Sequence, residues 1–185
     1  MGILIGADCS NASTNEVYSI LKSFGNPLLS GYEPVGELVE RTNGLIYGTT
    51  RFGGSKAGGT IFRVEKNGSN YLVIHSFGNP NDGITPEAGL IQGTDGMLYG
   101  TTLSGGNSNL GCIFRIGPDG SNYAILRSFG SIPIDGSSPR AGLIEASDGR
   151  LYGTTQFGGI SNAGTIFGLE KNGAGYNVMH NFGAD

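Results

Sequence analysis

Short apolar runs alternate with glycine-containing turns along the chain, and this pattern predicts β-strands. In the clearest stretch, the apolar runs occupy residues 142–146, 150–155, 164–169 and 176–182. Asp148-Gly149 separates the first two runs and Asn172-Gly173 the last two, and such dipeptides are the strongest short signal for a hairpin. Because glycine supplies the positive φ of a type I′ turn, we expect four sequential antiparallel strands in two tight hairpins.

Several of these runs are apolar on both faces, as in residues 71–74 and 123–126. A strand of an ordinary sandwich has one polar face, whereas these strands are typical of sheets covered on both sides. Small four-stranded sheets stacked face to face around an axis form a β-propeller. The alternative is a β-solenoid, but its coils are shorter and lack two Asn-Gly or Asp-Gly hairpins per repeat.

The same unit recurs along the sequence. The anchor tyrosines Tyr47, Tyr99 and Tyr152 are 52 and 53 residues apart, and each is followed by Gly-Thr-Thr. A fixed spacing of this size indicates an array of one supersecondary unit. We therefore divide the chain, as one propeller module, into four parts. Residues 1–25 are an N-terminal irregular segment with a half-blade or closing strand. The three blade repeats are residues 26–78, 79–130 and 131–185.

This division gives about three and a half blades of four antiparallel strands. Known propeller rings use roughly 4–8 blades, so we expect the ring to be completed by self-association, as a homodimer or another closed oligomer. The alternative is that the chain is a fragment of a longer repeat array. The sequence does not fix the number of blades in the closed ring.

The repeated motifs also resemble a known family. These motifs are a Gly-Leu-Ile strand, Asp-Gly-x-Leu-Tyr-Gly-Thr-Thr, Gly-Gly, Gly-Thr-Ile-Phe, Asn-Gly and a Ser-Phe-Gly exit. With this combination of motifs, the sequence from Glu16 to Gly183 resembles the GloVer-type bacterial β-propeller repeat. The resemblance implies a module of secreted or surface-attached bacterial proteins. It implies no catalytic residues.

Composition narrows the possible functions. Glycine fills 35 of 185 positions, but at fixed places in each repeat, and the 37% apolar content is enough for a packed fold. The net charge is −4 and basic residues do not cluster, which argues against a nucleic-acid partner. No apolar run is long enough for a membrane span, and the N-terminus does not read as a signal peptide.

The sequence contains no signature of a metal or cofactor site. Its two histidines, His75 and His180, occupy equivalent repeat positions, and its two cysteines lack zinc-ligand spacing. No nucleophile elbow and no phosphate-binding glycine loop are present. We therefore expect no cofactor, and we expect Cys112 to be a small buried residue; the sequence leaves the redox state of Cys9 and Cys112 open.

The strand order places the longer loops on one face of the ring, which we call the long-loop face. Binding residues concentrate on loops over a rigid scaffold, so we look for ligand contacts there. The candidate residues are Arg51, Lys56, Asp82, Asn107, Asp135, Arg140 and Gln156. Alternatively, all seven are solvated loop residues without a ligand. Asp82 and Asp135 each precede a Gly-x-x-Pro segment, and for these two the further alternatives are a structural role in that turn or the binding of Ca²⁺.

These observations favour a non-catalytic binding or scaffold module whose ligand is a glycan or another protein. The alternative is a hydrolase-like or lyase-like propeller enzyme with a site at the central opening. For that enzyme, Glu33 and Glu87 are the nearest acidic candidates on the long-loop face.

Overall fold

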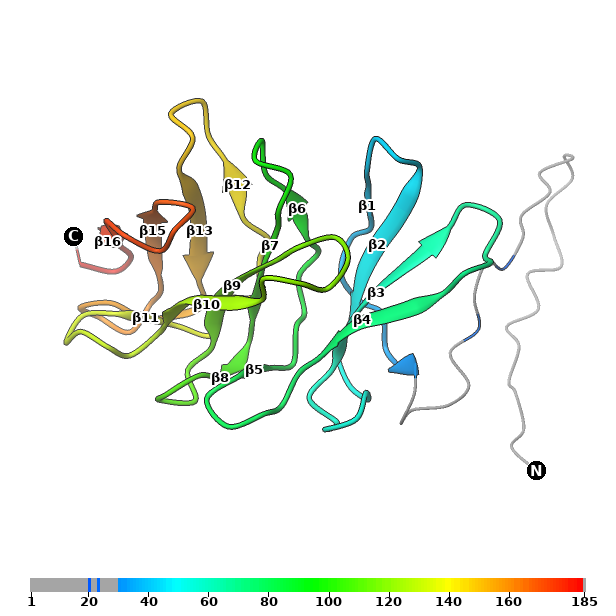
Figure 1. Cartoon of the computed structure of the whole chain (residues 1–185). Helices are drawn as coiled ribbons and strands as arrows, with labels where there is room; N and C mark the ends of the chain where they lie inside the picture. The colour runs from blue at the N-terminus through cyan, green and yellow to red at the C-terminus, as the bar shows by residue number, and fades with distance from the viewer. Residues whose placement is uncertain (1–19, 21–22, 24–29, 185) are drawn as a thin grey trace, which may run out of the picture.

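The protein is described here by a computed structural model, which defines residues 20, 23 and 30–184. Three four-stranded antiparallel sheets follow one another along the chain and fan out side by side (Figure 1). The first contains β1 (Val39–Glu40), β2 (Leu45–Thr50), β3 (Thr60–Glu65) and β4 (Leu72–Ser76). The second contains β6 (Ile91–Gln92), β7 (Leu98–Thr102), β9 (Cys112–Ile116) and β10 (Ala124–Ser128). The third contains β12 (Ile144–Glu145), β13 (Leu151–Thr155), β15 (Thr165–Leu169) and β16 (Asn177–Asn181).

The predicted blade unit of four sequential antiparallel strands is confirmed in each of these sheets. The innermost strands are shorter than expected: residues 142–146 contribute only the two-residue strand β12. The predicted N-terminal half-blade and Cys9 lie outside the described residues.

The hairpin turns differ from the predicted type I′. At residues 41–44, the Gly44 N–H donates to the Arg41 carbonyl (2.8 Å), and Gly44 has a φ of +79°. A type I′ turn needs positive φ at both central residues, but Asn43 is not left-handed. The geometry is a type I turn followed by a left-handed glycine. Asn43 Oδ1 accepts the Leu45 N–H (3.1 Å), and the equivalent Asn or Asp bond recurs in all six tight hairpins, two in each sheet.

The sheets stack through buried apolar side chains. Tyr47, Ile61 and Phe77 from the first sheet and its exit pack against Leu98 and Phe114 of the second in one cluster. A second cluster joins the next pair of sheets through Tyr99, Ile113, Phe129, Leu143, Leu151, Phe167 and Leu169. The middle sheet is therefore buried on both faces, as the two-sided apolar pattern predicts.

Each connector between sheets pairs with the middle loop of the next sheet, which the sequence pattern did not predict. These ladders join β5 (Gly83–Ile84) to β8 (Ser104–Gly105), and β11 (Gly136–Ser137) to β14 (Phe157–Gly158). A Cβ added at Gly83 would lie 2.5 Å from Thr102 Oγ1, so this connector position needs glycine. These ladders hold each connector against the next sheet, and they thereby hold in place the residues between the connector and the first strand of that sheet.

Candidate functional site

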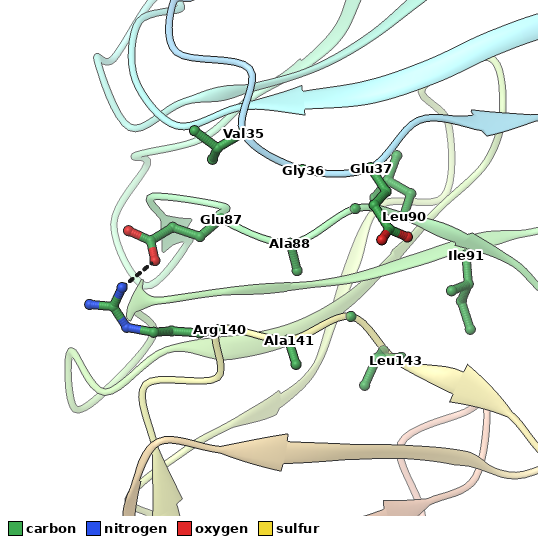
Figure 2. Close-up of a pocket in the computed structure, with 12 residues that line it drawn as sticks. Val35, Gly36, Glu37, Glu87, Ala88, Leu90, Ile91, Arg140, Ala141 and Leu143 are labelled. Carbon is green, nitrogen blue, oxygen red and sulfur yellow. Dashed lines mark hydrogen bonds and ion pairs between the residues drawn. The ribbon is translucent and has the colours of Figure 1, made fainter.

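The inner segments of the three sheets lie side by side and line an open hollow of about 360 Å³, which we call the central hollow (Figure 2). Its lining comes from residues 35–37, 87–91 and 140–143. The segments approach closely because glycines occupy their contact points. A Cβ added at Gly89 would lie 2.6 Å from the Glu37 carbonyl oxygen.

A continuous row of polar side chains lies at the edge of this hollow on the long-loop face. Glu87 pairs through Oε1 with Arg51 (3.0 Å) and through Oε2 with Arg140 (2.9 Å; Figure 2). Arg140 Nε donates to Gln156 Oε1 (2.5 Å). We call these four residues the polar row. It draws on all three sheets, because Arg51 follows β2, Glu87 precedes β6, and Arg140 and Gln156 flank the inner strands of the third.

Burial differs along the polar row. Glu87 is largely buried between the two arginines, whereas the Arg140 side chain is half-exposed and Arg51 is partly exposed. Arg51 also lies 3.6 Å from the exposed carboxylate of Glu33, and its guanidinium stacks over the Phe52 ring at 4.9 Å. The row therefore combines a fixed carboxylate with guanidinium groups that still face solvent.

The polar row breaks the internal repeat. The position of Glu87 is occupied by Val35 in the first unit and by Arg140 in the third. The position of Arg51 is occupied by Leu103 in the second unit and Gln156 in the third. Residues that support the common fold are shared between units, so residues that differ at one place are candidates for a specific function.

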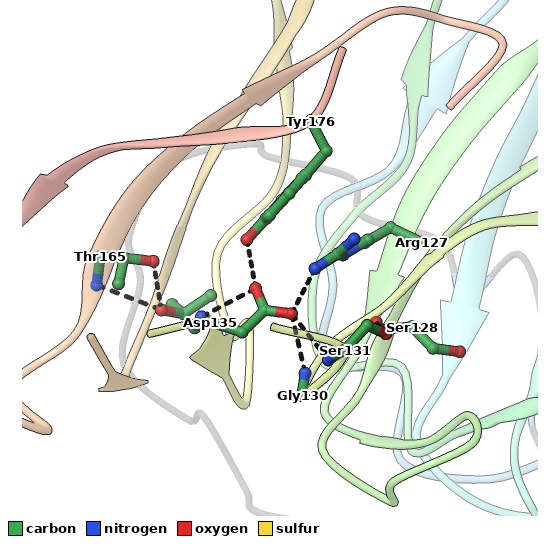
Figure 3. A network of polar contacts seen from close by, with 9 residues as sticks. Arg127, Ser128, Gly130, Ser131, Asp135, Thr165 and Tyr176 are labelled. Carbon is green, nitrogen blue, oxygen red and sulfur yellow. Dashed lines mark hydrogen bonds and ion pairs between the residues drawn. The ribbon is translucent and has the colours of Figure 1, made fainter. Parts of the chain in front are cut away.

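Asp135, by contrast, lies in the junction between the second and third sheets (Figure 3). Its carboxylate is 2.5 Å from Arg127 Nη2 and accepts the Tyr176 hydroxyl (2.6 Å). It also accepts three backbone N–H groups, those of Gly130, Ser131 and Gly136. Burial is the main cause that raises the pKa of Tyr176, and the hydrogen bond to Asp135 raises it further. The phenol therefore stays protonated and donates its hydroxyl hydrogen to the Asp135 carboxylate.

Asp82 occupies the same place in the junction between the first and second sheets. It accepts the Tyr123 hydroxyl and the Gly83 N–H, and His75 Nε2 lies 3.3 Å away. The His75 ring stacks on Tyr123 at 3.8 Å. Burial opposes ionisation of Asp82, but the hydrogen bonds from His75 and Tyr123 outweigh it, and the pKa of Asp82 lies below its ordinary value. Both aspartates thus join neighbouring sheets.

The other two candidates stay apart from the polar row. Lys56 lies exposed in the loop after β2. Asn107 sits in the corresponding loop after β7, where its N–H lies 3.4 Å from Ser128 Oγ. Of the seven predicted residues, the structure therefore brings together Arg51, Arg140 and Gln156, and it adds Glu87 between them.

Sequence reasoning missed Tyr123 and Tyr176, the tyrosines of the two junctions. Together with Tyr71, whose hydroxyl donates to Ser30 O (2.5 Å), they recur just before the last strand of each sheet, and this recurrence was the available signal. Within residues 30–184, no three His, Cys, Asp or Glu side chains gather closely enough to hold a metal ion. Over the same residues, no helix is long and apolar enough to cross a membrane.

Comparisons with known proteins agree with this architecture. The family model described as the Gloeobacter/Verrucomicrobia repeat matches residues 8–185. No curated protein sequence matches the chain. A chain in the crystal structure of the nidogen/laminin complex is similar in fold, with a TM-score of 0.54 and 17% identity over 80% of this chain and 48% of that one.

A candidate gluconolactonase of known structure is also similar, with a TM-score of 0.51 and 18% identity over 76% of this chain and 47% of that one. The chain therefore spans about half the length of these solved chains. At such low identity the likeness concerns the fold alone, which is that of a β-propeller module.

Proposed function

Since the chain belongs to the Gloeobacter/Verrucomicrobia repeat family and forms a propeller module, we propose that it is a non-catalytic binding protein for an uncharged glycan. The observation that carries the proposal is the polar row beside the central hollow. It lies on the long-loop face, and its residues depart from the repeat.

The charge balance of the row favours an uncharged ligand. Arg51 and Arg140 carry two positive charges, and Glu33 and Glu87 carry two negative charges within ion-pair distance of them. A guanidinium offers only donors and a carboxylate only acceptors, and the half-exposed Glu33 carboxylate supplies acceptors beside the guanidinium donors of Arg51 and Arg140. Sugar hydroxyls donate and accept, and they match such a surface better than an anion does.

The surroundings of Glu87 favour binding over catalysis. Each of its two carboxylate oxygens already pairs with an arginine. A general base needs a carboxylate oxygen within reach of the proton that it takes from the substrate. Glu87 is better placed to orient Arg51 and Arg140 than to accept a proton.

The test is a screen of the full chain on a glycan array, followed by titration calorimetry with the best uncharged glycan. We expect binding that falls at least about tenfold in Arg140→Ala, since a charged hydrogen bond contributes about 1.5–3 kcal/mol. Binding should also fall in Glu87→Gln, because Arg51 and Arg140 lose the carboxylate that orients them. Lys56→Ala is the matched control, because it removes a cation from the same face outside the polar row. Its affinity should equal that of the wild type.

An array without hits, or with acidic glycans alone, would overturn the proposal. Equal loss of binding in Lys56→Ala would also contradict it, because it would show an unspecific charge effect. A location outside the cell belongs to the same proposal, since extracellular surfaces carry the glycans that such a module would meet.

A further inference from the structure

Tyr32 differs from the other tyrosines that the structure describes. Within residues 30–184, six of seven tyrosines donate their hydroxyl group to a protein oxygen atom, and these are Tyr47, Tyr71, Tyr99, Tyr123, Tyr152 and Tyr176. The Tyr32 hydroxyl has no hydrogen-bond partner among these described residues, and Tyr32 is 39% exposed. Because a phenol both donates and accepts, Tyr32 presents a polar group that the fold does not use.

The backbone fixes Tyr32 beside the polar row. Tyr32 and Phe52 form a β-bridge, in which the Tyr32 N–H donates to the Phe52 carbonyl (2.9 Å) and the Phe52 N–H to the Tyr32 carbonyl (3.2 Å). The centres of the two rings are 5.5 Å apart, and the Arg51 guanidinium lies 4.9 Å from the centre of the Phe52 ring. Phe52 therefore contacts both Tyr32 and Arg51, and it holds the tyrosine ring at one end of the polar row.

The connector does not require an aromatic side chain at this position. The position of Tyr32 is occupied by Ile84 in the second unit and by Ser137 in the third. Both of these residues form the equivalent backbone pairing, with Ser104 and Phe157 respectively. Tyr32 thus departs from the repeat at one place, as the residues of the polar row do, and it lies on the same long-loop face.

A sugar ring matches the chemistry of Tyr32 and its neighbours. A pyranose has C–H groups on the face of its ring and hydroxyl groups around the edge. An exposed tyrosine combines a large apolar ring with a polar hydroxyl, so it can cover the C–H groups and bond a sugar hydroxyl. Next to it, the half-exposed carboxylate of Glu33 supplies acceptors and the guanidinium of Arg51 supplies donors for the other hydroxyls at the edge.

We propose that Tyr32 is a specificity-determining residue of the glycan site, where its ring stacks on one sugar unit while Arg140 binds another. This inference rests on the proposed function. Tyr32 belongs to the connector of the first sheet and Arg140 to that of the third, and Glu87 of the second lies between Arg51 and Arg140. A ligand that reaches both ends must cross all three connectors. The ligand is therefore an uncharged oligosaccharide rather than a monosaccharide.

The first test is titration calorimetry of the full chain with linear trisaccharides of glucose, mannose, galactose and xylose, and with the four monosaccharides. The best trisaccharide should bind at least about tenfold more tightly than its monosaccharide, since further units add hydrogen bonds to charged groups. Tyr32→Phe should weaken trisaccharide binding about threefold to tenfold, because one hydrogen bond is lost. Tyr32→Ala should weaken it by more, because the ring is lost as well.

Phe157→Ala is the matched control for these variants. Phe157 is an exposed aromatic residue at the position of Phe52 in the third sheet, but its partner there is Ser137 instead of a tyrosine. This variant should bind the trisaccharide as the wild type does. Circular dichroism should show that all the variants stay folded, since the side chains of Tyr32 and Phe157 face solvent.

The second test reports on the stacking itself. The chain contains no tryptophan, so Tyr32→Trp introduces a single indole whose fluorescence can be followed alone. We expect its emission to shift to shorter wavelength when the trisaccharide binds, because the sugar displaces water from the ring. The emission of Phe157→Trp should not shift.

The outcomes separate this inference from the proposed function. If Tyr32→Ala binds the trisaccharide as tightly as the wild type while Arg140→Ala loses affinity, the inference is overturned and the glycan function stands. Monosaccharide binding as tight as trisaccharide binding, or no trisaccharide binding at all, would also overturn the inference, whatever the glycan array shows. An array without uncharged hits would overturn the proposed function as well.

Discussion

The guanidinium of Arg127 lies 2.5 Å from the carboxylate of Asp135 and closes the junction between the second and third sheets. Arg127 also stacks over the Tyr176 ring at 3.9 Å, so one aspartate gathers a cation and a phenol from neighbouring sheets. His75 and Tyr123 repeat this arrangement around Asp82. The connector aspartates are therefore structural joints between blades, with consequences for stability.

Asp82→Asn should destabilise the protein by about 1.5–3 kcal/mol, because it replaces a buried carboxylate that accepts hydrogen bonds from the Tyr123 hydroxyl and the Gly83 N–H, and this is the range of a hydrogen bond to a charged group. The measurement is urea unfolding followed by circular dichroism. Asp148→Asn is the control, since Asp148 lies exposed in a hairpin turn, and it should cost much less. Equal losses of unfolding free energy in the two variants would show that the buried contacts of Asp82 add no more to stability than the exposed contacts of Asp148.

The same joint predicts a pH dependence. The pKa of Asp82 is lowered in the folded state from an ordinary value of 3.8, so the folded state favours the carboxylate. Its contribution is present above that value and is lost as the pH falls through the lower folded-state pKa. The difference in unfolding free energy between wild type and Asp82→Asn should therefore shrink below about pH 4. A difference independent of pH from 2 to 6 would contradict this assignment.

Cys112→Thr should leave the fold intact and raise stability by about 1 kcal/mol, the net value of one hydrogen bond. Cys112 stands where the other sheets have Thr60 and Thr165, whose hydroxyls bond Thr50 (2.7 Å) and Thr155 (2.8 Å). Thermal unfolding measures the effect, and Cys112→Ala, which forms no such bond, is the control. A threonine variant no more stable than the alanine variant would contradict the prediction.

The Cys112 thiol should resist alkylation in the folded protein. Burial raises its pKa to about 11, so the reactive thiolate is scarce at pH 8. Labelling with iodoacetamide, located by peptide mass spectrometry, should modify Cys112 only after urea is added. Labelling at equal rates with and without urea would show that the site is open.

Gly83→Ala should be more destabilising than Gly44→Ala. A Cβ at Gly83 would lie 2.5 Å from Thr102 Oγ1, and overpacking of this kind costs about 1–3 kcal/mol. A Cβ at Gly44 would meet nothing within 4 Å, so only its left-handed φ of +79° opposes alanine, at about 1 kcal/mol. Chemical denaturation of both variants gives the order, and the reverse order would contradict the proposed role of the connector.

Thr101→Val should cost about 1 kcal/mol, because it leaves the Ala141 carbonyl without its donor from the neighbouring sheet. Thr154→Val is the matched control, because Thr154 is the exposed counterpart of Thr101 in the third sheet, and it should change the stability of an isolated chain by less than about 0.5 kcal/mol. Measurements at low protein concentration keep association out of the comparison. Equal effects would show that the bond across the junction contributes nothing measurable.

Much of this architecture could be predicted from local sequence. Apolar runs bounded by Asn-Gly or Asp-Gly specify strands and hairpins, since turn residues and hydrophobic alternation act within a few residues. The turn type was wrong, because the pattern does not reveal that Asn43 keeps a negative φ and uses its side chain to bind Leu45. The ladders of the connectors were missed because two-residue strands carry no periodicity.

The sequence by itself determined the repeating unit, its strand order and the loops on which polar residues gather, because these follow from short-range patterns. Only the tertiary structure decided that Arg51, Glu87 and Arg140 form one row while Asp82 and Asp135 become joints between sheets. These residues lie far apart in the sequence, and their contacts depend on how each sheet is rotated and packed against the next. That rotation depends on how the buried side chains of two neighbouring sheets pack against each other, so it cannot be read from any single segment of the chain.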